Sequence, residues 1–260
     1  MIIAGLTGGI GYGKTTFARL LARHSHNTCH YETWELVAEV GNALRSQHPN
    51  HPSPDDLTAI NEWLYPLIDI VSMSMHASIT FADLKLTPER LKQHPERFDK
   101  LLEYLRLMQN QPELANLDIT DETKDIYRSL LQWLGGYMVI KAGSGVWYNE
   151  LLRRIAHLQS SGYDLVTVGG VRYPADAERL RNAGGVIICI NRPGLPERDS
   201  RDITERDRSL IEPDSIVIND GSLEELARCS EIVYHDLLLH QLQPQYSAQT
   251  ITADKHKSIK

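Results

Sequence analysis

Hydrophobic residues follow two alternating patterns along the chain. Short apolar runs, typical of strands buried in a parallel sheet, occupy residues 1–6, 165–168, 186–190 and 215–218. Residues 29–34 are a candidate for a further strand. Between these runs, apolar residues recur every three or four positions, which is the spacing of amphipathic helices. The alternation of strands with helices predicts an α/β fold around a central parallel sheet.

The segment from residue 46 to residue 119 has a different, helical pattern. It opens on a loop rich in Pro, His, Asn and Asp, and Pro88 and Pro95 then mark the first turns of two helices. We therefore expect a core formed by residues 1–45 and 120–240. Residues 46–119 form a helical insertion in this interpretation, as a substrate-binding, lid or dimerisation region.

Three local signals predict further boundaries. Gly135 and Gly136 follow a helical stretch and predict its end, because glycine is common at helix C-caps. Ser222 and Glu225 have the spacing of a capping box and predict the start of the last helix. Residues 241–260 are polar and aperiodic, so we expect an unstructured tail.

Composition narrows the class of protein. The 260 residues are 42% hydrophobic and carry a formal net charge of −7, which does not favour bulk attraction to nucleic acid or to a membrane. The start of the chain lacks a signal-peptide pattern, and no apolar run reaches the length of a membrane span. Three widely spaced cysteines predict neither a disulfide framework nor a metal site. We expect a cytoplasmic protein whose partner is a small molecule. Whether the protein forms a homodimer stays open.

Residues 8–15 match the phosphate-binding pattern G-x-x-x-x-G-K-[ST], between a predicted strand and a predicted helix. Glycines let the backbone approach a triphosphate, and the helix N-terminus favours anions. Lys14 is expected to neutralise the β- and γ-phosphates, and Thr15 to ligate Mg²⁺. The predicted nucleotide-binding residues are Gly8, Gly9, Ile10, Gly11, Tyr12, Gly13, Lys14, Thr15 and Thr16.

Two arginines follow predicted strands directly. Arg172 and Arg192 lie just past the runs at 165–168 and 186–190, where ligands of parallel sheets bind. Both are therefore candidates to face the phosphates of the loop. Residues 197–208 are nearly all charged, with four arginines. This segment is either a solvated loop or a mobile lid that brings arginine to the transferred phosphate.

Four more polar residues are candidates for binding. Arg128 and Gln132 lie four residues apart on one helix face, which suits a phosphate and a base but equally a solvated surface. Glu32 and Glu35 follow the candidate strand at 29–34. Their carboxylates are either surface acids or groups that hold Mg²⁺ or orient an acceptor.

Two families share sequence features with this chain. Residues 5–14 resemble the opening of dephospho-coenzyme A kinases. The second half resembles the phage-type deoxynucleoside monophosphate kinases and their relatives. The pieces that carry this second resemblance follow in order; they are residues 128–135, Trp147, 161–164, 171–176, 184–187, 192–194, 203–205, Asp214 and 218–226.

The second resemblance implies a P-loop kinase-like fold with three layers. It also implies transfer of the γ-phosphate of ATP, with Mg²⁺, to a (deoxy)nucleoside monophosphate to give the diphosphate. Lys14, Arg172 and Arg192 are the implied catalytic residues. The implied acceptor-binding residues are Arg128, Gln132, Arg172, Thr204 and Glu205.

Gly170 departs from the family pattern, because relatives commonly carry Asp two residues before the arginine that is Arg172 here. Three functions stay open. The first is a nucleoside monophosphate kinase, in which the acid is either missing, so that chemistry is slow, or replaced by Glu32 or Glu35. The second is a dephospho-coenzyme A kinase or other small-molecule kinase, and the third, which Gly170 favours, is a module that binds nucleotide without transferring phosphate.

Overall fold

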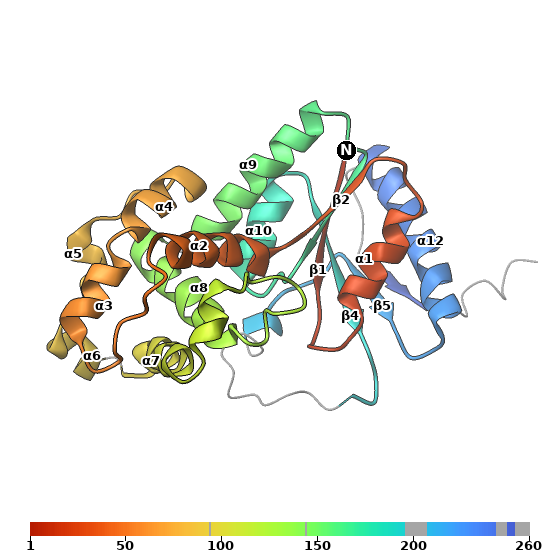
Figure 1. Cartoon of the computed structure of the whole chain (residues 1–260). Helices are drawn as coiled ribbons and strands as arrows, with labels where there is room; N and C mark the ends of the chain where they lie inside the picture. The colour runs from red at the N-terminus through yellow and green to blue at the C-terminus, as the bar shows by residue number, and fades with distance from the viewer. Residues whose placement is uncertain (94, 144, 196–206, 243–248, 253–260) are drawn as a thin grey trace, which may run out of the picture. The chain divides into compact units, whose positions relative to one another are not determined.

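A six-stranded sheet is the centre of the computed structural model, which describes all residues except 94, 144, 196–206, 243–248 and 253–260 (Figure 1). The strand order is β2-β3-β1-β4-β5-β6, and every neighbouring pair is parallel. The predicted α/β fold with a central parallel sheet is therefore confirmed. The strands are β1 (Ile2–Thr7), β2 (Thr28–Glu32), β3 (Leu165–Gly169), β4 (Val186–Asn191), β5 (Ser215–Ile218) and β6 (Gln249–Ile251).

The chain divides into two compact units, one formed by Met1–Thr33 with Leu152–Lys260 and the other by Trp34–Leu151. The first is called the sheet unit here and the second the helical unit. This division assigns residues 34–45 and 120–151 to the helical unit, whereas the sequence analysis placed them in the core.

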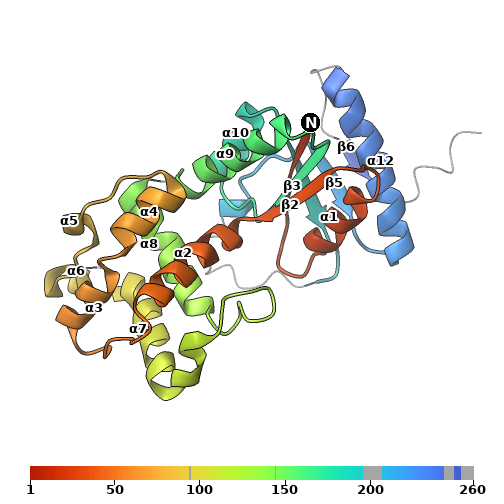
Figure 2. The ribbon, with the colours of Figure 1, turned by 45° about the horizontal axis from the view of Figure 1, so that its top comes forward.

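Helices cover both faces of the sheet in the sheet unit. On one face, α1 (Lys14–Ala22) and α12 (Leu223–Leu242) pack against each other (Figure 2). On the opposite face lies α10 (Pro174–Asn182), so close that a Cβ on Gly5 would lie 2.8 Å from Leu180 Cδ1. The alternation of side chains along β1 supplies both faces, which gives three layers. The cluster under α1 and α12 includes Ile2, Ala4, Leu6, Phe17, Leu21, Leu226 and Val233.

The last helix starts where the sequence predicts. Ser222 N donates to Glu225 Oε2 at 2.6 Å, and Glu225 N donates to Ser222 Oγ at 3.2 Å. These reciprocal bonds confirm the capping box. Downstream of the helix, the expectation of an unstructured tail over 241–260 is wrong for Gln249–Ile251, which form β6 beside β5 with Ile251 buried. A three-residue strand is too short for a periodic signal, and the free backbone groups of β5 stabilise it.

The helical unit contains the predicted helices that begin at Pro88 and Pro95. Its elements are α2 (Thr33–Gln47), α3 (Leu57–Leu64), α4 (Leu67–Met75), α5 (Phe81–Leu84), α6 (Pro88–Gln93), α7 (Pro95–Asn110), the 3₁₀ helix η1 (Pro112–Asn116) and α8 (Arg128–Ala142). The first residues of α9 (Val146–Ser160) also belong to it.

The predicted helix end at Gly135 and Gly136 is wrong, because α8 continues through both residues to Ala142. Two glycines cost the helix about 1 kcal/mol each. Tertiary contacts offset this cost. Gly135 O accepts a 3.0 Å hydrogen bond from Trp147 Nε1, and a Cβ on Gly135 would lie 3.7 Å from Val37 Cγ2. The C-cap is instead Gly143, at φ +96°.

Arg45 is a buried cation in the helical unit, with 3% of its surface exposed. Its Nη2 donates to the carbonyl oxygens of Leu114, Ala115 and Leu117 at 2.9, 3.0 and 2.7 Å. Its guanidinium also lies over the Tyr127 ring, 4.3 Å from the centroid. One charged group therefore satisfies the backbone of η1 and of the segment before α8.

We expect Arg45→Ala to lower the free energy of unfolding by roughly 3 kcal/mol, because the carbonyls of Leu114, Ala115 and Leu117 lose a charged donor and the buried side chain loses its packing on Tyr127. Urea unfolding measures this change. Arg128→Ala is the matched control, since Arg128 pairs with Asp125 on the surface and such pairs contribute little. Equal losses for the two variants would contradict this account of Arg45.

Candidate phosphate-binding site

The loop between β1 and α1 is shaped by two glycines in particular. Gly8 has φ +136°, and a Cβ there would lie 2.3 Å from Ile190 O on β4. Gly13 is the N-cap of α1 at φ +94°, and a Cβ there would lie 2.6 Å from Asn219 Nδ2. Both positions require glycine, because of left-handed backbone and of close approach. The loop thus lies in close contact with the end of β4 and with Asn219, the residue after β5.

Asn219 holds the loop from the end of β5. Its Nδ2 donates to Tyr12 O at 2.9 Å, and its backbone N donates to Asn191 O at 2.7 Å. The amide therefore links the loop to β4 and β5. In the sequence, Asn219 belongs to a stretch that resembles the kinase family and has no predicted role of its own. Its position one residue past a predicted strand was the available signal.

Lys14 is the first residue of α1, and its ammonium folds back over the loop. Nζ donates to Gly8 O at 2.8 Å and to Gly9 O at 2.9 Å. The free N–H groups at the helix N-terminus add positive potential at the same place. Thr15 and Thr16 follow on the exposed first turn. Together these groups form a site for a polyanion.

The other two predicted loop residues differ in exposure. Ile10 is exposed at the tip, whereas Tyr12 is buried with 8% of its surface exposed. A Cβ on Gly9 would lie 2.7 Å from the Tyr12 ring, so the ring packs under the loop. Both residues therefore contribute backbone rather than side-chain groups to an anion.

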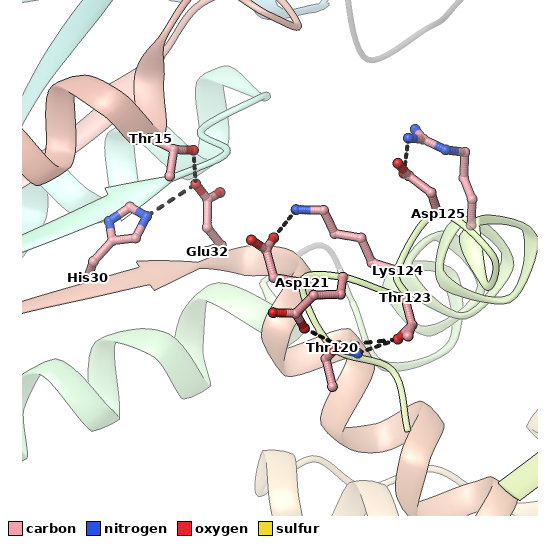
Figure 3. A network of polar contacts seen from close by, with 10 residues as sticks. Thr15, His30, Glu32, Thr120, Asp121, Thr123, Lys124 and Asp125 are labelled. Carbon is pink, nitrogen blue, oxygen red and sulfur yellow. Dashed lines mark hydrogen bonds and ion pairs between the residues drawn. The ribbon is translucent and has the colours of Figure 1, made fainter. Parts of the chain in front are cut away.

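Glu32, the last residue of β2, brings a carboxylate to this loop. Thr15 Oγ1 donates to Glu32 Oε1 at 3.3 Å, and His30 Nε2 lies 3.2 Å from the same oxygen (Figure 3). Burial alone would raise the pKa of Glu32. Its interactions with His30, Lys14 and Thr15 outweigh burial, so the pKa lies below its usual value. The carboxylate is therefore ionised at neutral pH.

Two glycines at the end of β3 leave room for this carboxylate. Glu32 is in register with Gly169, and a Cβ on Gly169 would lie 2.3 Å from the carboxylate atoms. Gly170 has φ +74°, and a Cβ there would lie 2.8 Å from Thr33 Oγ1 and 3.6 Å from Glu32 Oε2. Gly170, where the family resemblance leads us to expect Asp, is thus next to a carboxylate supplied by the neighbouring strand.

The structure places Arg172 and Arg192 at the same edge of the sheet as the loop. Arg172 follows β3 and Arg192 follows β4, and both side chains are exposed. The parallel strands bring these carboxyl ends together with the end of β1. Backbone bonding reinforces this placement, because Val171 N donates to Leu6 O at 3.2 Å.

Three of the remaining predicted residues, Arg128, Gln132 and Glu35, belong to the helical unit. Arg128 begins α8 and pairs with Asp125, and Gln132 is exposed on the same helix. Thr204 and Glu205 lie outside the described residues, as does most of the charged segment 197–208.

The oxygen groups at the loop suit Mg²⁺. Mg²⁺ binds through few protein oxygens and otherwise through water and phosphate. A hydroxyl and an ionised carboxylate, from Thr15 and Glu32, meet at 3.3 Å beside the anion site. Among the residues that the structure describes, no cluster of three or more His, Cys, Asp or Glu forms a separate metal site. Thr15 and Glu32 are therefore the residues that fit this metal.

Comparison with known proteins identifies the family of this chain. Residues 67–229, more than half of the chain, match the model of the deoxynucleotide monophosphate kinase family. The chain belongs to this family. The resemblance to phage-type kinases is thereby confirmed, while the likeness of residues 5–14 to dephospho-coenzyme A kinases stays a prediction. The phosphate-binding loop and Glu32 precede the matched region, so their assignment rests on this chain's own residues and geometry.

Two curated relatives agree with the family. The chain is 30% identical over 113 residues to the deoxynucleotide monophosphate kinase of Enterobacteria phage T4, covering 42% of this chain and 46% of the relative. It is 28% identical over 80 residues to a putative deoxynucleotide monophosphate kinase of Acanthamoeba polyphaga mimivirus, covering 31% and 38%. The chain thus spans less than half the length of the curated relatives it matches.

We expect that Gly170→Asp does not supply a useful carboxylate and lowers the free energy of unfolding, because the backbone is left-handed and the site is crowded by Thr33 and Glu32. Gly184→Asp is the matched control, since Gly184 has φ +81° with nothing within 4 Å of a Cβ. Urea unfolding of both variants separates backbone strain, about 1 kcal/mol, from crowding. A Gly170→Asp protein as stable as Gly184→Asp would contradict the crowding.

Proposed function

We propose that this protein transfers the γ-phosphate of ATP to a deoxynucleoside monophosphate and releases the diphosphate. One observation carries the proposal: in a chain of this kinase family, a glycine loop with Lys14 folded over it lies beside the Thr15–Glu32 oxygen pair. A site of this kind binds a triphosphate and a divalent cation. Phosphoryl transfer requires mainly positioning and charge neutralisation, and these groups provide both.

The loop binds ATP through its backbone N–H groups and through Lys14. The ammonium exchanges the carbonyls of Gly8 and Gly9 for phosphate oxygens when the triphosphate enters. This exchange costs little, because both partners are oxygen acceptors at the same loop. The charge of Lys14 then offsets the negative charge that develops on the transferred group and the leaving oxygen.

Thr15 and Glu32 are the proposed holders of Mg²⁺, which would supply positive charge to the phosphates of the nucleotide when bound. The ionised state of Glu32 is what such a role requires. Glu32 thereby replaces the carboxylate that relatives carry at the position of Gly170. Glu35, the alternative, belongs to the helical unit.

The acceptor requires cations but no strong base. A nucleoside monophosphate attacks through a phosphate oxygen that is already anionic, so no proton has to leave it. Arg172 and Arg192, exposed at the strand ends, are proposed to hold the phosphates in line. Arg128 and Gln132 of α8 are proposed to bind the acceptor nucleotide, and Thr204 and Glu205 keep their predicted role in the acceptor and lid region.

The Glu32 carboxylate also favours a second candidate. A dephospho-coenzyme A kinase transfers phosphate to a sugar hydroxyl, whose proton must be accepted by a base. An ionised carboxylate beside the loop suits that reaction as well. Residues 5–14, which resemble those kinases, point the same way. The substrate is a small molecule under either candidate function. The cytoplasmic location and the homodimer stay predictions. No described helix is long and apolar enough to cross a bilayer.

The test is release of ADP from Mg-ATP over a panel of deoxynucleoside and nucleoside monophosphates, with dephospho-coenzyme A in the same panel. We expect turnover with one or more deoxynucleoside monophosphates. Turnover with dephospho-coenzyme A alone would establish the second candidate. Binding of Mg-ATP without turnover on any acceptor would support a module that only binds nucleotide.

Lys14→Ala is expected to lower kcat at least about 100-fold, because the loop loses its positive charge. The melting temperature should stay close to that of the wild type, because Lys14 is not part of the hydrophobic core of the sheet unit. Steady-state kinetics and thermal melting on the same preparation measure both. Undiminished turnover of a folded Lys14→Ala protein would refute the proposed function.

Glu32→Gln keeps the size of the side chain and removes its charge. We expect kcat to fall roughly 100-fold and the Mg²⁺ concentration for half-maximal rate to rise. Glu178→Gln is the matched control, because Glu178 is exposed on α10 of the same unit. If Glu35→Gln lowers the rate and Glu32→Gln does not, the carboxylate has been assigned to the wrong residue.

A further inference from the structure

His30 and Thr167 form a pair behind the Glu32 carboxylate. His30 Nδ1 lies 2.8 Å from Thr167 Oγ1, and His30 Nε2 lies 3.2 Å from Glu32 Oε1. Thr167 is buried, with 1% of its surface exposed, and stands opposite His30 in the register of β2 and β3. The hydroxyl therefore fixes one side of the ring. The carboxylate occupies the other side (Figure 3).

The strand pairing explains why these groups meet. His30 and Glu32 are two residues apart on β2, so their side chains point to the same face. On β3 the matching positions are Thr167 and Gly169. The first carries a hydroxyl at the level of His30, and the second carries no side chain at the level of Glu32. The carboxylate can therefore lean over the end of β3 while the imidazole supports it from below.

The hydrogen-bond chain also selects how the ring is protonated. A hydroxyl both donates and accepts, so Thr167 satisfies Nδ1 of either a neutral or a charged ring. When Thr167 donates to Nδ1, the proton of the neutral imidazole resides on Nε2 and points at Glu32. The opposite tautomer would direct the Nε2 lone pair at a carboxylate. Both allowed forms of His30 thus donate to Oε1.

We infer that His30, oriented by Thr167, is a positioning residue that fixes the Glu32 carboxylate for its role at the phosphate-binding loop. The inference rests on the proposed function of Glu32. Thr15 Oγ1 donates to the same carboxylate oxygen, and that hydroxyl is itself assigned to Mg²⁺. His30 keeps the carboxylate in place when Thr15 exchanges its partner. Residues that orient metal-holding groups in this way contribute about 10- to 100-fold to affinity or activity.

The test is a double-mutant cycle of His30→Ala and Glu32→Gln. In the wild-type background, His30→Ala should lower kcat about 10-fold and leave KM for the acceptor unchanged. In the Glu32→Gln background the same change should have little further effect, because His30 acts through Glu32. Equal losses in both backgrounds would overturn the inference. His30→Gln, which retains a donor, should recover part of the loss in kcat. Thr167→Ser, which keeps the hydroxyl, should have a higher kcat than Thr167→Val.

His24→Ala is the matched control. His24 makes a similar bond to a hydroxyl, Ser230 Oγ at 3.0 Å, between α1 and α12 and with no carboxylate in that bond. The His24→Ala variant should change the melting temperature at most, and its kcat should equal that of the wild type. A loss of kcat equal to that of His30→Ala would show that such pairs act only through stability, and would also overturn the inference.

Calorimetric titration of ATP gives a readout that does not depend on turnover. His30→Ala should weaken binding of ATP about 10-fold in the presence of Mg²⁺ and not in the presence of EDTA. Equal affinities of the wild type and the variant with Mg²⁺ would contradict the inference. If the wild type binds Mg-ATP but phosphorylates no acceptor, the proposed function fails, and this titration still decides the role of His30.

Discussion

The parallel pairing of β1 with β3 and β4 is the constraint on which the site depends. It lays the carboxyl ends of three strands at one edge of the sheet, and there the chain leaves β1 for the glycine loop. The loop then approaches β4 so closely that Gly8 has no space for a side chain beside Ile190 O. Asn219, from the next strand, holds Tyr12 O. An anion site made of backbone groups requires this support, because isolated loops do not keep their N–H groups aligned.

The second constraint is one of space at the end of β3. Gly169 and Gly170 remove two side chains beside the loop, and the carboxylate of Glu32 on β2 occupies the adjoining volume. The carboxylate is thereby supplied by the edge strand β2, while β3 supplies the room for it.

Much of the fold followed from local patterns. The strand–loop–helix at the start of the chain, the helices beginning at Pro88 and Pro95 and the capping box at Ser222 depend on neighbouring residues only, and the structure bears them out. Predictions failed where a distant contact outweighed a local preference. The α8 helix passes through two glycines because Trp147 and Val37 pack on it, and β6 forms because β5 offers an open edge. Arg45 gave no sign in the sequence that it satisfies the backbone of η1, because its partners lie about 70 residues further along the chain.

The sequence by itself determined the prediction of a phosphate-binding loop and of the residues that line it, and the observation that Gly170 stands where a carboxylate is expected. Those features are encoded within short stretches, because the loop is built from consecutive residues. Only the tertiary structure showed that Glu32 lies against Thr15 and His30, and that His30 lies against Thr167. Thr167 is 137 residues from His30 along the chain. Their contact arises from the order and register of strands β2 and β3, which are set by the packing of the whole sheet and have no signature in either segment.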